Sequence, residues 1–348
     1  MMPAQLPDVS VRVNGAVLPP AAQADLRSVT VQEDLRALSM FTLELHNWDD
    51  KQLRISWSDS ALFAVGNEVE ISIGYVGDLH RVMLAEVTSL EPTFTAGQES
   101  LLTVRGYDHR HRLARGRKTR TFVQMKDSAI AAQIAREAGL RTMIDDTKST
   151  LSYVIQPNVS DWDFLRQRAS LIGYETYVKD KVLYFRPPKS DDPPASKLSL
   201  GADVTEFSPR LATLGQPTGL TVRGWDVKQK QAIVASARVP PDPPGKKSGA
   251  TTARRAFGAA PVTVLGQPVR SLAEAGSVAD GQFTAGALAY VEGDVVAFGR
   301  PLLRAGTVVD ISGAGQTFSG SYYITSVTHA VTSEHGYLTS FTVQRTAA

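Results

Sequence analysis

The chain contains no cysteine among its 348 residues. Disulfides, thiolate metal sites and a cysteine nucleophile are therefore excluded. An excess of charge of one sign is also lacking, because the net charge is only +2 and gives no overall attraction to nucleic acid or to a membrane. No apolar run approaches the roughly 20 residues that a helix needs to cross a bilayer. The fold must therefore depend on packing and on assembly.

Residues 1–10 lack the basic and apolar regions of a signal peptide. We therefore expect synthesis in the cytosol, and any later extracellular role would need another route. The content of 43% hydrophobic and 21% charged residues is ordinary for a soluble globular protein. A chain of this length can bury a large core, and we expect more than one domain.

Known catalytic patterns are missing as well, including the nucleophile elbow, the zinc-binding His-Glu-x-x-His and the phosphate-binding loop. Asp161 and Asp163 could serve acid–base chemistry on a glycan, but acidic residues in the first turn of a predicted helix also favour its dipole. His109 and His111 could begin a metal site, but a third ligand is not apparent and the neighbouring arginines oppose a cation. We expect no catalytic residue, no cofactor and no bound metal ion.

Internal similarity is the main feature that is present. Leu102-Thr-Val-Arg-Gly-Tyr-Asp108 recurs as Leu220-Thr-Val-Arg-Gly-Trp-Asp226. A longer correspondence consists of three pairs of segments with nearly equal spacing: Val69-Glu-Ile-Ser72 with Val309-Asp-Ile-Ser312, Thr88-Ser89 with Thr325-Ser326, and Thr103-Val104 with Thr342-Val343. The two correspondences conflict over the equivalent of the strand at 102–106. We take the longer one as the guide, and it predicts two related β-barrels; the alternative is that any β-rich chain resembles itself.

Residues 8–106 alternate in hydrophobicity over several short segments, which is typical of strands in a small barrel or sandwich. The segment Phe41/Leu43/Leu45 is the clearest case, with its apolar residues directed inward. Asn14-Gly15 predicts a hairpin turn.

From 111 to 199 the pattern becomes α/β. One predicted helix is capped by Asp127 or Ser128 and a second by Ser160, whose hydroxyl can accept from the N–H of Asp163. A hairpin is predicted across Asp180-Lys181.

The region after the strand at 220–225 contains a segment that interrupts regular secondary structure and then a third predicted helix. Residues 240–249 are rich in proline and glycine and predict a mobile loop or linker. The capping-box pattern Ser271-x-x-Glu274 predicts a helix from Leu272 to about Tyr290. Three glycines within that helix (276, 281 and 286) weaken the prediction.

A basic run stands between the first barrel and the insert. It carries six cationic residues: Arg110, Arg112, Arg115, Arg117, Lys118 and Arg120. Contact with nucleic-acid phosphates is one interpretation, although no aromatic residue lies within the run to stack on bases. A solvated loop is another. A third is subunit pairing through arginine forks, and on that interpretation the candidate interface residues are Arg112, Arg115, Arg117 and Arg120.

Taken together, these segments resemble a known family. The residues that carry the resemblance are Val104-Arg-Gly-Tyr-Asp108, Val159-Ser-Asp-Trp-Asp-Phe-Leu165, Gly173-Tyr174, Leu183-Tyr-Phe-Arg-Pro187, Phe318-Ser-Gly-Ser-Tyr322 and Val327-Thr-His329. In this order they are similar to the phage late control protein D family. That family comprises baseplate hub proteins of contractile tails and injection systems, and it is similar to the N-terminal hub region of the VgrG spike proteins of type VI secretion.

The resemblance implies a homotrimeric, non-enzymatic hub in which three chains present six similar barrels to a hexameric tail tube protein, while the opposite side keeps three-fold symmetry for a spike. The chain ends at Ala348 without a needle-like repeat, so we expect a separate spike protein. Other baseplate proteins are expected partners, and nucleic acid only as a cargo in the lumen. The resemblance implies assembly in the bacterial cytoplasm and a place in a virion tail or an extracellular injection particle.

The expected fold class is mainly β with α+β inserts. We expect a first β-barrel at 1–110, an α/β insert at 111–199, a second β-barrel formed by 200–240 with 306–348, and a Pro/Gly-rich loop with a helical excursion at 241–305. Two alternative functions stay open at this point: a nucleic-acid-binding β-barrel that uses the run 110–120, and a cell-wall glycosidase that uses Asp161 and Asp163.

Overall fold

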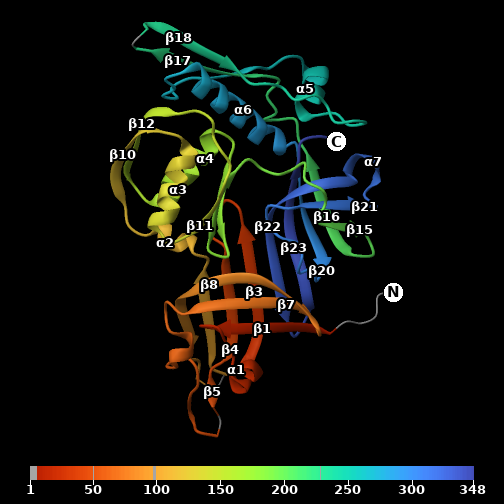
Figure 1. The fold of residues 1–348 in the computed structure, drawn as a ribbon. Coiled ribbons are helices and arrows are strands. Elements are labelled where there is room, and N and C mark those ends of the chain that lie inside the picture. The colour runs from red at the N-terminus through yellow and green to blue at the C-terminus, as the bar shows by residue number, and fades with distance from the viewer. Residues whose placement is uncertain (1–5, 50, 97–98, 228) are drawn as a thin grey trace.

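The computed structural model describes residues 6–49, 51–96, 99–227 and 229–348, and these are mainly β, which confirms the predicted class (Figure 1). The N-terminal unit contains β1 (Pro7–Val13), β2 (Ala16–Val17), α1 (Pro20–Asp25), β3 (Leu26–Asp34), β4 (Met40–His46), β5 (Trp48–Asp49), β6 (Arg54–Ile55), a 3-10 turn η1 (Ala61–Phe63), β7 (Glu68–Tyr75), β8 (Asp78–Thr93) and β9 (Leu101–Tyr107). The C-terminal unit contains β15 (Ser196–Ser199), β16 (Val204–Leu211), β20 (Val291–Phe298), β21 (Val308–Ser312), α7 (Gly315–Phe318), β22 (Gly320–Thr332) and β23 (Gly336–Arg345).

The two units share one sheet. Its strands follow the order β16-β20-β23-β22-β3-β4-β9-β8-β7-β1-β2, and β21 pairs with both β22 and β15. Each unit nevertheless buries its own apolar core. In β4 the side chains of Phe41, Leu43 and Leu45 are fully buried, as the alternation predicts. The hairpin turn at Asn14-Gly15 is also confirmed, with both residues at positive φ between β1 and β2.

The α/β insert contains α2 (Arg110–Ala114), β10 (Lys118–Met125), α3 (Asp127–Glu137), β11 (Arg141–Ile144), β12 (Leu151–Val159), α4 (Asp161–Leu171), β13 (Glu175–Lys179) and β14 (Val182–Arg186). The hydroxyl of Ser160 accepts from the N–H of Asp163 at 3.0 Å, so the predicted cap of α4 is confirmed. The predicted hairpin across residues 180–181 is confirmed as well. The predicted cap of α3 is wrong, because Lys126 occupies the N-cap position and Asp127 lies inside the first turn.

The excursion contains β17 (Leu220–Asp226), β18 (Gln231–Ser236), α5 (Gly249–Phe257), β19 (Val262–Val264) and α6 (Leu272–Leu288). β17 and β18 were expected in the second barrel, but they form a separate three-stranded sheet with β19. The apolar residues of β17, such as Val222, pack on Val278 and Phe283 of α6 rather than on the C-terminal core. Conversely, β20 was expected in the excursion, but it pairs with β16 and β23 in the large sheet.

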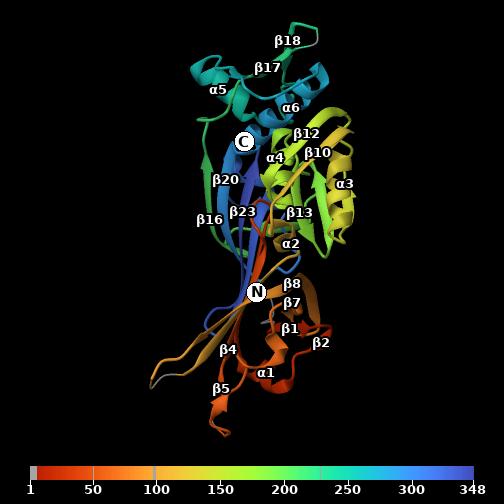
Figure 2. The same ribbon diagram turned by 90° about the vertical axis from the view of Figure 1, so that its left-hand side faces the viewer.

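The parts stack along one direction. Figure 1 shows the N-terminal unit at the bottom, the insert and the C-terminal unit side by side above it, and the excursion at the top. Figure 2, turned by 90°, shows the same order and an elongated molecule. None of the helices within the described ranges is long and apolar enough to cross a membrane.

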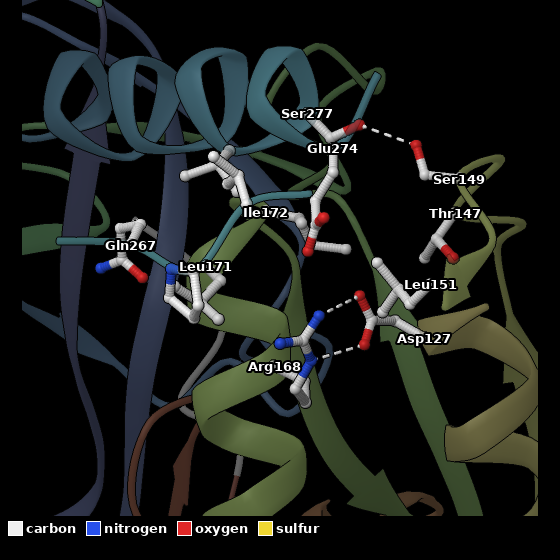
Figure 3. Close-up of a pocket in the computed structure, with 13 residues that line it drawn as sticks. Asp127, Thr147, Ser149, Leu151, Arg168, Leu171, Ile172, Gln267, Glu274 and Ser277 are labelled. Atoms are coloured by element: carbon white, nitrogen blue, oxygen red, sulfur yellow. Dashed lines mark hydrogen bonds and ion pairs between the residues drawn. The ribbon is translucent and has the colours of Figure 1, made fainter. Parts of the chain in front are cut away.

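The insert and the excursion meet at a pocket of about 30 Å³ (Figure 3). Arg168 of α4 donates through Nε to Asp127 Oδ1 at 2.6 Å and through Nη2 to Oδ2 at 2.9 Å. This pair explains why Asp127 does not cap its helix, since its carboxylate ties α3 to α4 instead. Across the pocket, the hydroxyls of Ser149 and Ser277 are 3.4 Å apart and link the insert to α6.

Gly281 is one of the three glycines within the predicted helix α6, and the structure explains why glycine is needed at this position. A Cβ at Gly281 would lie 2.1 Å from the carbonyl carbon of Ile172 and 2.4 Å from the nitrogen of Gly173, at the end of α4. The backbones of α6 and of this turn therefore touch directly, and only glycine permits that distance. Gly276, in the same helix, has nothing within 4 Å of its ideal Cβ position.

These two glycines give opposite expectations. Gly281→Ala should lower the free energy of unfolding by about 1–3 kcal/mol through overpacking. Gly276→Ala is the matched control and should raise it by up to about 1 kcal/mol through helix propensity. Chemical denaturation of both variants measures the difference, and equal effects of the two substitutions would contradict the close α6–α4 contact.

Candidate assembly interface

The structure places the start of the basic run against the N-terminal unit. Arg112 donates through Nε to Glu86 Oε2 at 2.7 Å and through Nη2 to Oε1, and His111 Nε2 lies 2.7 Å from the same Oε2. Burial alone would raise the pKa of Glu86, but the hydrogen bonds from Arg112 and His111 lower it to about 2. Glu86 belongs to β8, so this cluster fixes the insert to the first unit.

The end of the run is bound within the insert. Arg120 donates to Glu137 Oε2 at 2.6 Å and to Asp161 Oδ1 at 2.8 Å, and Lys118 Nζ donates to Asp161 Oδ2 at 2.6 Å. Arg110 is buried and donates through Nε to Asp108 Oδ2 at 2.7 Å. Four of the six cations therefore have carboxylate partners in the same chain, which disfavours a free phosphate-binding surface.

The four candidate interface arginines thus fall into two groups. Arg112 and Arg120 form the intrachain pairs just described, whereas Arg115 and Arg117 are exposed. A role of these residues between subunits stays a prediction. Asp161, considered above for glycan chemistry, is held by two cations, and Asp163 accepts from the Ser160 hydroxyl at 2.7 Å.

Five strand pairings occur twice in the sheet, and the strands involved follow one another in the same chain order. The N-terminal unit has β1·β7, β7·β8, β8·β9, β9·β4 and β4·β3. The C-terminal unit has β15·β21, β21·β22, β22·β23, β23·β20 and β20·β16. Only the first pairing differs in direction, since β1·β7 is antiparallel and β15·β21 is parallel. Two related β-barrels were predicted, and the structure shows two β units with the same pairing pattern, joined in one sheet.

One bulge of the N-terminal unit coincides with a bulge of the C-terminal unit. Thr88 is an extra residue in β8·β9, and Thr325 is an extra residue in β22·β23. The Thr88 hydroxyl donates to the carbonyl of Arg105 at 3.4 Å, and the Thr325 hydroxyl donates to the carbonyl of Thr342 at 3.3 Å. A bulge bends its strand, so both units turn at the same point. The predicted equivalence of Thr88-Ser89 with Thr325-Ser326 is confirmed.

The first and last pairs of the sequence correspondence have different outcomes. Val69 faces Ala85 and Val309 faces Tyr322, each three residues before its bulge, so the first pair is confirmed. The alignment of Thr103-Val104 with Thr342-Val343 is wrong by two residues, because Thr342 occupies the position of Arg105. A slip of two residues leaves every side chain on the same face, and the alternation cannot detect it.

The ladder β22·β3 joins the two units, with Ser326–Thr332 antiparallel to Ser28–Asp34. His329 is fully buried in its centre. Its Nε2 donates to the Leu303 carbonyl at 3.1 Å, and its Nδ1 accepts from the Tyr337 hydroxyl at 2.9 Å. Burial lowers the pKa of His329 to about 4, so the ring is neutral at pH 7.

A buried ion pair closes the same joint. Arg304, in the loop before β21, donates through Nε to Glu33 Oε2 at 2.8 Å and through Nη2 to Oε1. It also donates to the carbonyls of Arg81 and Val82 on β8, at 2.9 and 2.8 Å. Burial alone would raise the pKa of Glu33, but Arg304 lowers it below its usual value. One guanidinium of the C-terminal unit thus holds two strands of the N-terminal unit.

Removal of one partner of this pair should be costly. Arg304→Met alone leaves Glu33 buried and unpaired, and we expect a loss of about 3–5 kcal/mol in the free energy of unfolding. Glu33→Leu together with Arg304→Met should lose much less, because no charge is then left unpaired. Chemical denaturation of the two single variants and the double variant tests the coupling, and strictly additive losses would contradict it.

Two strand edges of the large sheet have no partner strand among the described residues. β16 is the last strand of the sheet and lies at the outer side of the C-terminal unit in both views (Figures 1 and 2). β8 pairs with β7 only up to Glu86, so its edge beyond the bulge is free on that side. In Figure 2 this part of the orange β8–β9 hairpin projects from the body of the molecule.

Glu175 is a partly buried acid that lines a pocket. The pocket has a volume of about 350 Å³ and lies between the insert and the C-terminal unit. Burial raises the pKa of Glu175 to about 7, although the Tyr323 hydroxyl donates to it at 2.7 Å and Arg186 Nε lies 3.2 Å away. No group of three or more potential metal ligands occurs in the part of the chain that the structure describes.

The raised pKa of Glu175 predicts that the stability of the folded protein depends on pH. Between about pH 4.5 and 7 the folded protein keeps a proton on Glu175 that the unfolded chain loses, so stability falls as the pH rises through this range. Glu175→Gln should remove that dependence, which is worth up to about 3 kcal/mol at 1.36 kcal/mol per pKa unit. Chemical denaturation at pH 5 and pH 8 measures it, and an unchanged difference between the two pH values would contradict the assignment.

The comparisons with known proteins agree with this geometry. A family model described as the Alg8 N-terminal domain matches residues 3–333. A 43 kDa tail protein of prophage MuSo2 from Shewanella oneidensis has the same fold, with a TM-score of 0.73, 14% identity, and coverage of 97% of this chain and 98% of its own. A tail protein from Neisseria meningitidis MC58 has a TM-score of 0.70 and 15% identity, and the alignment covers 97% of this chain and 96% of that one.

A type VI secretion component from E. coli, described as structurally similar to T4 bacteriophage tail proteins, gives a TM-score of 0.60 and 13% identity. The alignment covers 96% of this chain and 76% of that one. No protein in a search of curated sequences matches the chain. The chain therefore has the fold of these tail proteins and of this type VI secretion component, as the sequence resemblance implied.

Proposed function

Since this chain belongs to the Alg8 N-terminal domain family, we propose that it is a non-enzymatic hub of a contractile tail or injection system. In this role three copies form a ring that presents six similar β units to a hexameric tail tube, and three-fold symmetry on the opposite side receives a spike. The observation that carries the proposal is the repeated pairing pattern, including the coincident bulges at Thr88 and Thr325.

The physical requirement behind the proposal is a match between different symmetries. A tube of six subunits offers the same surface every sixty degrees, and a trimer can meet it only if each chain carries two similar surfaces. The two units provide these surfaces, and they are fixed to each other by the β22·β3 ladder and the Glu33–Arg304 pair. The fold shared with tail proteins supports the same role.

The insert and the excursion lie to the side of the two units and above them (Figure 1). Their different structures make them unsuitable for a six-fold contact, so we assign them to three-fold contacts with the spike or with other baseplate proteins. The particle would be assembled in the bacterial cytoplasm and then act in a virion tail or an extracellular injection particle, with any nucleic acid passing only through the lumen.

The oligomeric state is the first test. Light scattering of the purified protein, alone and with its tail tube protein, should give a particle of three 37.6 kDa chains. A monomer at every concentration, also in the presence of the tube protein, would contradict the proposed function.

A further inference from the structure

We propose that the free edge of β8 in one copy pairs with the free edge of β16 in a second copy, in the register of the internal β22·β3 ladder. This inference rests on the proposed trimeric ring and specifies how its chains are joined. The two edges are unpartnered among the described residues, and each is the equivalent of a strand that is already paired inside the chain.

The internal ladder defines both equivalences. β8 corresponds to β22 through the bulges at Thr88 and Thr325. β3 corresponds to β16 through a second pair of bulges, because Arg27 is the extra residue in β3·β4 and Thr205 is the extra residue in β16·β20. Since β22 pairs with β3 within one chain, β8 of a neighbour can pair with β16 in the same way.

Transfer of the internal register gives a specific set of partners. In the internal ladder Val327 faces Glu33, Thr328 faces Gln32 and Val331 faces Val29. The equivalent rungs between copies, which follow from the bulge equivalences, are Ser89–Ala212, Leu90–Leu211, Glu91–Arg210, Pro92–Pro209, Thr93–Ser208 and Phe94–Phe207.

The side chains on these rungs are complementary. Glu91 and Arg210 are both exposed and carry opposite charges, which favours a directly opposed pair. Phe94 is 62% exposed, and in this register it meets Phe207, whose ring packs edge-on against Tyr322 of the C-terminal core. An exposed aromatic side chain beside an unpaired edge is a feature that a second copy would cover.

The rung Leu90–Leu211 shows how the two joints of the ring would differ. Leu211 stands where Glu33 stands in the internal ladder, and both leucines pack beside the apolar cores of their own units. The internal joint has the buried Glu33–Arg304 pair at this level, whereas the joint between copies would have two leucines there. An apolar rung forms between separate chains without the cost of burying charges.

Two prolines lie on the free edges, and this register confines their cost to one rung. Asn47 N donates to Ser100 O at 2.8 Å, and Ala212 N donates to Tyr290 O at 3.0 Å. In an antiparallel pair, successive residues direct their N–H and C=O groups to opposite sides, so these bonds show that the backbone groups of Pro92 and Pro209 face the free edges. A proline has no N–H to donate. Because the register places them opposite each other, the missing donors fall on a single hydrogen-bonded rung, and the next hydrogen-bonded rungs, Leu90–Leu211 and Phe94–Phe207, keep their bonds.

The pairing also has the direction that a ring needs. Inside the chain β3 pairs with β22. Between chains β16, the equivalent of β3, would pair with β8, the equivalent of β22. This is a head-to-tail contact, and such contacts close into a ring when the rotation per unit divides a full turn. With two units per chain and three chains, each unit would turn by about sixty degrees.

Cysteine cross-linking tests the register, because the natural chain has no cysteine and every thiol is an introduced one. Glu91 and Arg210 would form a non-hydrogen-bonded pair with Cα atoms about 4.5 Å apart, a distance that a disulfide can span. The variant Glu91→Cys/Arg210→Cys, oxidised in the assembled particle, should run as covalent dimers and trimers on a non-reducing gel. The same is expected of Thr93→Cys/Ser208→Cys.

The matched control is Glu91→Cys/Glu206→Cys. Glu206 lies on the same face of β16, four residues from Arg210 and therefore about 13 Å along the strand. This variant should stay a single chain on the gel. Light scattering and circular dichroism of each variant, before oxidation, establish that it is folded and trimeric.

The outcomes separate the two proposals. Cross-linking of both in-register pairs and not of the control supports the register. A particle that is trimeric by light scattering but links none of the pairs, or links the control equally, overturns the β8·β16 contact and leaves the trimeric hub standing. The absence of any trimer, with folded protein, overturns both.

Discussion

The β22·β3 ladder is the contact on which the rest of this structure depends. It runs between residues about 300 positions apart in the sequence and makes one sheet out of two units, each with its own core. A buried neutral histidine in its centre and the Glu33–Arg304 pair at its end remove any freedom to slide, since both groups would lose their partners in another register. The angle between the units is therefore fixed by the fold.

A fixed angle between similar units has a consequence for assembly. A chain that already contains one unit-to-unit joint needs only to repeat it with a neighbour to build a closed ring. The differences between the units then become as important as their similarity. The strand β15 runs parallel to β21 where β1 runs antiparallel to β7, and the insert and the excursion follow different strands. In the proposed ring these features would keep the three-fold symmetry of the whole, while the repeated strands would approach six-fold symmetry.

Local chemistry made part of this architecture predictable. The Ser160 cap and the Asn14-Gly15 turn depend on neighbouring residues, and the sequence contains all of them. The repeat around Val69 and Val309 was found because its residues are nearly the same. In contrast, the position of β17 was predicted wrongly, because its alternation is that of β9 although it packs on α6. β20 was assigned to the excursion and not to the second barrel, because its partner β23 comes only after β21 and β22 in the sequence.

The candidate interface was the least predictable part. The density of arginines in the run 110–120 indicates charge but not distance, and the carboxylates that bind them, such as Glu86 and Asp161, are separated from them by 26 to 43 residues. Free strand edges leave no signal in the sequence until the pairing of every other strand is known. The equivalence of β16 and β3 became visible only from the bulges.

The claim that one chain supplies two equivalent positions in a closed ring can be tested directly by electron microscopy of the assembled protein viewed along its axis. The account predicts a closed ring of six similar densities around a central opening, with three-fold symmetry once the insert and the excursion are resolved. A two-fold particle, or an open filament of chains, would contradict it.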